Sequence, residues 1–153
     1  MVDANNVFVE VKPLSSVDDS LLNEIMNLCS SCDDVPTRKA EIKTLLHDGS
    51  IHILVAKEAK GIADRMLGFV LFYSHYSTWM GESTVIKHIA TLQQDTVVAK
   101  QLIQETFNVC NKKGIRRYDV FTTEEWLKQV LAEMQFVNLS VEEDWDCYTL
   151  EIQ

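Results

Sequence analysis

The chain has 153 residues, which is enough for one domain with its own core. Its formal net charge is −9, so its surface repels phosphate backbones and nucleic acid is not expected as a partner. Although 46% of the residues are hydrophobic, no apolar run is long enough to span a membrane, and no basic and apolar leader opens the chain. We therefore expect an intracellular protein, cytoplasmic or nuclear, with reduced cysteines and no membrane contact.

The first part of the chain predicts a strand, two helices and a second strand. Apolar and polar residues alternate before Pro13, which ends the first strand. Ser16 and Asp19 have the spacing of a capping box at the start of the first helix, and Asp34 with Pro36 opens the second. The expected ranges are 7–12 (strand), 16–29 (helix), 34–48 (helix), 51–57 (strand) and 58–65 (hairpin).

The stretch 66–81 predicts the central strand of the sheet. It begins with an aliphatic and aromatic run that is apolar on both faces of an extended strand. Leu67, Phe69, Leu71 and Tyr73 are expected on one face, and Val70 and Phe72 on the other. A strand that is apolar on both faces must be covered on both, so it belongs in the middle of a sandwiched sheet.

The second half predicts an alternation of strands and helices. Asp95 can cap a long helix that ends at Gly114, and Thr122 with Glu125 has the spacing of another capping box. The expected ranges are 83–91 (strand), 95–112 (helix), 115–122 (strand), 122–134 (helix) and 145–152 (strand). The long helical crossover predicts that strands 83–91 and 115–122 run parallel.

This order of elements resembles the GNAT superfamily of acetyl-CoA-dependent N-acetyltransferases. Two stretches resemble its spermidine/spermine (diamine) branch: Gly68-Phe69 followed by Tyr73, Tyr76, Trp79 and Gly81, and Glu142-Glu143-x-Trp145. The resemblance implies a single α/β (α+β) domain over residues 1–153, with three layers. It implies a mixed, mostly antiparallel sheet of six to seven strands with helices on both faces. It also implies a homodimer.

In the family, a pyrophosphate cradle of pattern Gln/Arg-x-x-Gly-x-Gly/Ala follows the fourth strand. The matching residues here are Gln94, Asp95, Thr96, Val97, Val98 and Ala99. Val97 stands where the family has a glycine, and its stiff side chain adds bulk where backbone should touch phosphate. Asp95 adds a negative charge, and no Lys or Arg occurs from 89 to 99. We expect acetyl-CoA binding to be weak or absent.

The family's catalytic groups are also replaced. Leu131 occupies the position of the tyrosine that protonates the departing thiolate, and leucine cannot donate a proton. Tyr118 or Tyr148 would have to substitute for it. Acidic residues that receive a polyamine are replaced around Ile86, Lys87 and His88, and Lys87 would repel a polyamine.

Several other residues allow a functional and a structural interpretation. His88 could be a general base or a half-buried histidine with a hydrogen-bond partner. Tyr76 and Trp79 could line a substrate pocket or an interface, or belong to the core. The pair Cys29 and Cys32 has no second close pair, so no metal site is expected. The basic residues at 112–113 and 116–117 could offset a helix dipole, or reach a phosphate or a partner.

Two functions follow from these observations. The first is a degenerate acetyltransferase (a pseudoenzyme) that acts by binding another protein. The lost glycine and the lost tyrosine favour it. The second is an active acetyl-CoA-dependent N-acetyltransferase that acts on a polyamine or another amine. The acidic surface and the intact order of elements favour this alternative.

Overall fold

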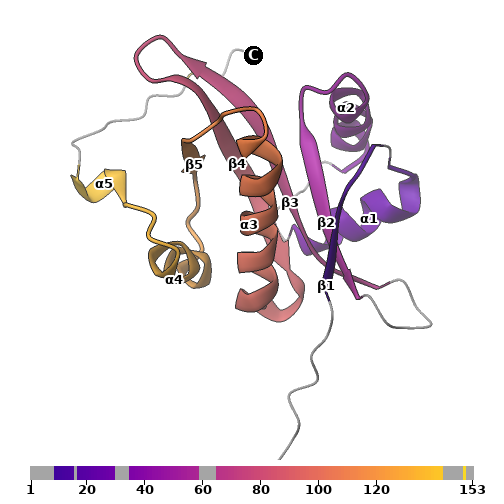
Figure 1. Ribbon diagram of the computed structural model, residues 1–153. Helices are drawn as coiled ribbons and strands as arrows, with labels where there is room; N and C mark the ends of the chain where they lie inside the picture. Colours follow the sequence, from indigo (N-terminus) through magenta and orange to yellow (C-terminus); the bar gives the residue numbers. More distant parts are fainter. Residues whose placement is uncertain (1–8, 16, 30–34, 59–64, 143–149, 151–153) are drawn as a thin grey trace, which may run out of the picture.

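The computed structural model describes residues 9–15, 17–29, 35–58, 65–142 and 150. Five strands form one sheet in the order β1-β2-β3-β4-β5 (Figure 1). The strands are β1 (Val9–Pro13), β2 (His52–Glu58), β3 (Met66–Ser77), β4 (Gly81–Thr91) and β5 (Tyr118–Val120). Neighbours pair antiparallel except β4 and β5, which run parallel as predicted. The described sheet is thus mixed and mostly antiparallel, but it has five strands rather than six or seven, and the strand expected at 145–152 lies outside the described residues.

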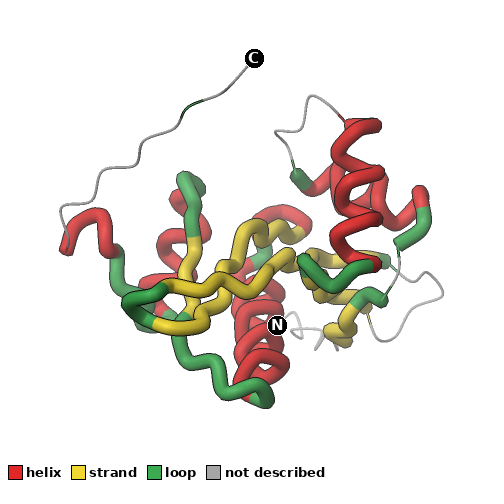
Figure 2. The backbone as a smooth tube through the Cα atoms, turned by 90° about the horizontal axis from the view of Figure 1, so that it is seen from above, coloured by secondary structure: helices red, strands yellow, loops and turns green. Residues whose placement is uncertain are grey.

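The central position predicted for β3 is confirmed, and its two faces build two cores. Val70 and Phe72 pack with α3 (Thr96–Asn111) and α4 (Glu125–Glu133), whereas Phe69 and Leu71 pack with α1 (Asp19–Leu28) and α2 (Val35–His47). Figure 2 shows helices on both sides of the strands, so the fold has three layers. Within the described chain, no helix is long and apolar enough to cross a membrane.

A bulge changes one of the predicted faces of β3. Ala56 pairs with Gly68 and Lys57 with Met66, which leaves Leu67 as an extra residue. The expectation that Leu67 shares a face with Phe69 is therefore wrong: Leu67 packs against the core under α3, and Met66 lies in the other core. A single inserted residue reverses the side-chain alternation beyond it.

The helix caps also differ from the predicted capping boxes. Asp18 caps α1, where its carboxylate accepts from the Leu21 N–H at 2.7 Å, so Asp19 belongs to the helix. The cap residue of α4 is Glu124, and the Thr122 hydroxyl accepts from the Glu124 N–H instead of bonding within the helix. Asp95 caps α3 as predicted. A short helix, α5 (Leu139–Glu142), follows α4.

The close approach of β3 and β4 at Gly68 generates a stability prediction. A Cβ atom at Gly68 would lie 2.7 Å from the Ala90 carbonyl oxygen and 2.9 Å from Thr91 Cγ2. Because the first contact is with backbone, the strands must separate to admit it. We expect Gly68→Ala to lower the free energy of unfolding by about 1–3 kcal/mol in urea titrations. Ser74→Ala, at an exposed position of the same strand, is the control, and equal stability of both variants would contradict the prediction.

Candidate functional site

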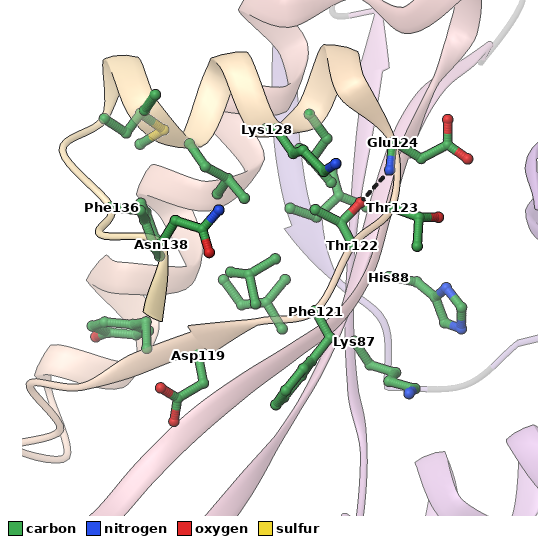
Figure 3. A pocket seen from close by; sticks show the side chains of 18 of the residues that line it. Lys87, His88, Asp119, Phe121, Thr122, Thr123, Glu124, Lys128, Phe136 and Asn138 are labelled. Atoms are coloured by element: carbon green, nitrogen blue, oxygen red, sulfur yellow. Dashed lines mark hydrogen bonds between the residues drawn. The ribbon is translucent and has the colours of Figure 1, made fainter. Parts of the chain in front are cut away.

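The candidate site is a cleft of about 1470 Å³ beside the parallel strands (Figure 3). β4 and β5 pair only from Thr84 to Ile86 and from Tyr118 to Val120. Beyond these pairs β4 continues to Thr91, whereas the chain after Val120 leads into α4. The cleft is lined by the second half of β4, by the segment from β5 to α4, and by residues of α4 and α5; Leu28 and Cys29 at the end of α1 and Met80 at the β3–β4 turn also line it.

A second bulge brings two polar side chains of β4 onto one face of this cleft. Leu71 pairs with His88 and Phe72 with Ile86, which leaves Lys87 as the extra residue. Ile86 and Ile89 pack under α3, while Lys87 and His88 are both exposed and line the cleft. The bulge therefore places a cation and an imidazole side by side where a regular strand would bury one of them.

His88 has an altered affinity for protons. Its pKa lies below the ordinary value of histidine, because the surrounding protein partly desolvates the ring and, secondly, because Lys87 repels a positive charge on it. The imidazole is therefore neutral near pH 7 and can accept a proton. In Figure 3 the ring extends away from α4, on the same side of the cleft as Lys87.

On β5, a carboxylate faces the cleft already paired with a cation. The Nε atom of Arg117 donates to both carboxylate oxygens of Asp119, at 3.1 and 3.3 Å. Asp119 is the register partner of Val85, so it lies on the same face as the nearby Lys87. The two charges of the Arg117–Asp119 pair compensate each other, whereas Lys87 has no ion pair within the described part of the chain.

The start of α3 is closed by its own cap. The Oδ1 atom of Asp95 accepts from the N–H groups of Val97 and Val98, at 2.9 and 3.0 Å. These are two of the donors that a helix N-terminus would otherwise offer to an anion. The side chain of Val97 is 63% exposed. Of the six residues aligned with the cradle, only Gln94 lines the cleft among the described lining residues.

One turn further along α3, the cation Lys100 also has a partner within the chain. Lys100 forms an ion pair with Glu133 near the end of α4, at 2.5 Å. The Lys100 ammonium group lowers the pKa of the Glu133 carboxyl through their hydrogen bond and their charges. The pair joins the two helices on the side of the sheet that carries the start of α3.

Of the residues considered for the missing acid, Leu131 and Tyr118 are described by the structure. Leu131 lines the cleft and is buried in the core under α4. Tyr118 packs its ring on Phe107, and its hydroxyl lies 3.4–3.5 Å from the oxygens of Phe107, Asn111 and Ile115. Burial, and then Cys110, raises the pKa of Tyr118, which makes it a weaker acid. Tyr148 lies outside the described residues.

No family model and no curated protein match the sequence, but solved structures do. A probable acetyltransferase superposes with a TM-score of 0.74 at 18% identity, over 94% of this chain and 98% of its own. An aminoglycoside acetyltransferase from an uncultured soil metagenomic sample gives 0.72 at 16% identity, over 95% and 99%. A predicted acetyltransferase with acetyl-CoA from Clostridium acetobutylicum gives 0.68 at 12% identity, over 95% and 96%. The chain has the GNAT fold. Because the identities are 12–18%, the comparison concerns the fold and not the activity.

Within the GNAT fold, the predicted site residues fall into two groups. Gln94, His88 and Leu131 line one cleft. Tyr76 and Trp79 lie at the turn between β3 and β4, with exposed fractions of 72% and 91%. The turn forms because Ser77 Oγ accepts from the N–H groups of residues 79 and 80. On β3, His88 pairs with Leu71 and Glu82 pairs with Tyr76. These partners are five positions apart, so the two groups lie roughly 16 Å apart along the strand.

The remaining candidates show no site of their own. Cys29 is partly buried at the end of α1, Cys32 lies outside the described residues, and no cluster of metal-binding side chains occurs among the residues that the structure describes. The basic stretch divides in two. Lys112 and Lys113 follow the end of α3, whereas residues 116 and 117 line the cleft.

Three features of the site are absent from the sequence predictions. They are the Lys87 bulge, the Lys100–Glu133 ion pair and the Arg117–Asp119 pair. The bulge has a signal in the sequence, because two consecutive polar residues interrupt an otherwise apolar strand. Lys100 and Glu133 are 33 residues apart, and no local pattern connects them.

We predict that His88 titrates below the ordinary pKa of histidine, as measured by NMR of the ring protons. The Lys87→Ala change should raise this pKa only in part, because desolvation is the larger cause. Since the folded state disfavours the charged ring, His88 favours folding above its ordinary pKa and opposes it as the pH falls. His52, whose pKa is lowered by desolvation and by Lys113, is the internal control and should not respond to Lys87→Ala. A His88 pKa at or above the ordinary value would contradict this account.

Proposed function

We propose that this protein is acetyltransferase-like in fold but does not transfer acetyl groups, and that it acts by binding another protein. The observation that carries the proposal is the Asp95 carboxylate on the N–H groups of Val97 and Val98. In this arrangement the chain supplies its own anion to the helix N-terminus where the family binds pyrophosphate.

The energetic argument concerns the phosphates of acetyl-CoA. To reach the α3 backbone, a phosphate must displace Asp95 and then remain beside its negative charge. The loss of two charge-assisted contacts costs about 3 kcal/mol, or roughly a hundredfold in affinity. Lys100, the first cation after the cradle, is held by Glu133, so it is not free to compensate. The residues present therefore do not fit the cofactor's phosphates.

The chemical argument concerns the departing thiolate. Leu131 offers no proton, and the hydroxyl of Tyr118 is directed to acceptors at the end of α3. Neither of these two described residues would therefore protonate a thiolate that leaves in the cleft. This supports the loss of turnover independently of cofactor binding.

One observation favours the alternative, an active acetyl-CoA-dependent acetyltransferase that acts on an amine. The neutral imidazole of His88 in the cleft could accept a proton from an ammonium substrate. Lys87 beside it would repel a diamine or polyamine, so an amine that carries no second positive charge fits this alternative better.

We predict that calorimetry detects no micromolar binding of acetyl-CoA to the unmodified protein. The triple variant Asp95→Gly, Val97→Gly, Glu133→Gln should bind at least tenfold more tightly, because it frees the helix donors and Lys100. Adding Leu131→Tyr should then be needed for measurable turnover.

Asp18→Gly, which removes the cap of α1 instead, is the control for the loss of a helix cap. It should leave acetyl-CoA affinity unchanged. A micromolar dissociation constant for the unmodified protein, together with acetylation of any amine, would falsify the proposal. An unimproved triple variant would show that the cradle is misplaced on this sequence.

We further propose that the β3–β4 turn is an interface, with a second copy of the chain as its partner. Tyr76, Trp79 and Met80 are exposed there, and large exposed apolar side chains are enriched at interfaces. The dimer that the family resemblance implies supports a second copy as the partner.

We expect sedimentation velocity at micromolar concentration to detect a dimer. The Trp79→Ala change should raise the dissociation constant of this dimer by tenfold or more. Phe121→Ala removes another exposed aromatic side chain, in the cleft, and should not change the dimer. A monomer at all concentrations would exclude the second copy as the partner.

A further inference from the structure

The cleft has the opposite charge balance to the chain as a whole. The sequence carries 23 acidic and 14 basic residues. Among the described residues that line the cleft, four are basic and only two are acidic; they are Lys87, Arg116, Arg117 and Lys128, and Asp119 and Glu124. Lys128 pairs with Glu125 and Arg117 with Asp119, which leaves Lys87 and Arg116 as the cleft cations without an ion pair within the described residues. These two charges favour an anionic ligand.

Two of these cations are available to a ligand. Lys87 is exposed and forms no ion pair within the described residues. Arg117 uses only its Nε atom on Asp119, so the two terminal nitrogens of the guanidinium group keep their donors. Lys87 belongs to β4, where the bulge keeps it out of the core, and Arg117 directly precedes β5.

The same opening exposes one edge of the sheet. Pairing between β4 and β5 ends at Ile86, and residues 87–91 of β4 line the cleft. On the side facing β5, the backbone of these residues has no strand partner within the described part of the chain. An extended peptide can pair with such an edge through its own N–H and C=O groups.

We propose that the cleft binds an acidic peptide segment of a protein partner, in an extended conformation along residues 87–91 of β4. Its backbone pairs with β4, and one of its carboxylates contacts Lys87. This inference rests on the proposed function, because it places the peptide in the cleft in place of acetyl-CoA. A basic segment is disfavoured, because Lys87 would repel it.

The test is an NMR titration of the ¹⁵N-labelled full chain with a capped Glu-Val-Glu-Val-Glu-Val-Glu peptide, taken to millimolar concentration so that weak binding is visible. We expect shifts of the amides of Lys87, His88 and Thr91, which saturate. The corresponding Lys-Val peptide should cause none. A peptide of the same Glu-Val sequence that is N-methylated at every residue lacks the N–H donors on both edges and should bind at least tenfold more weakly, because it cannot donate to the ladder.

The matched variants are Lys87→Glu and Lys112→Glu. Both make the same charge change at an exposed lysine, but only Lys87 lines the cleft. We expect Lys87→Glu to weaken binding by about tenfold and Lys112→Glu to leave it within about twofold. Equal weakening by both variants, shifts located elsewhere, or no shifts at all would overturn the proposal.

Titration of the same labelled sample with acetyl-CoA separates this inference from the proposed function. If neither compound causes shifts, the proposed peptide site is wrong, whereas the proposed loss of acetyl-CoA binding is supported. Tight acetyl-CoA binding would overturn the proposed function. Tight acetyl-CoA binding that leaves the peptide shifts at residues 87–91 unchanged would overturn this inference as well, because the peptide is proposed to take the place of the cofactor.

Discussion

The separation of β4 from β5 after three residue pairs is the constraint on which the site depends. Parallel strands in a continuous sheet would use their backbone donors on each other. Here β5 is held against α3 instead. The Tyr118 ring packs on Phe107 with ring centroids 4.4 Å apart, and Ile115 is buried in the same core. The chain then leaves the sheet for α4. The cleft is thus a consequence of packing on the α3 side.

The start of α3 shows a conflict between helix stability and ligand binding. A free helix N-terminus attracts anions because its first N–H groups lack partners. An Asp cap satisfies them and stabilises a helix by about 1 kcal/mol relative to alanine. A glycine-rich turn leaves them for a phosphate but gives up this stabilisation. In this chain the Asp95 carboxylate accepts from the N–H groups of Val97 and Val98, so it occupies the position that an anionic ligand would take.

The sequence was sufficient for features set by long hydrophobic patterns. The two-faced apolar run identified β3 as central, and the length of the α3 crossover identified the parallel pair. It was insufficient where one residue is inserted against a partner strand. The side of the sheet on which Leu67 lies depends on a bulge of β3 against β2, and the exposure of Lys87 depends on a bulge of β4 against β3. Such bulges are defined by the pairing of two strands and not by local composition. The expected range 115–122 was also too long for β5, because apolar residues there pack on α3 without a strand partner.

No single substitution would free both the N–H donors at the start of α3 and the Lys100 ammonium group for a phosphate. Val97→Gly alone opens the backbone but leaves the Asp95 carboxylate on the same N–H groups. Removing Asp95 alone frees the donors, but Lys100 stays with Glu133 on the neighbouring helix. A change of Asp95 or of Glu133 therefore removes an existing contact before a ligand can compensate for it. Since natural domains have only about 5–15 kcal/mol of stability, such steps are costly when taken singly. Two N–H donors at the start of α3 and the nearby Lys100 thus already have partners within the chain, and a phosphate would have to compete with each of these partners.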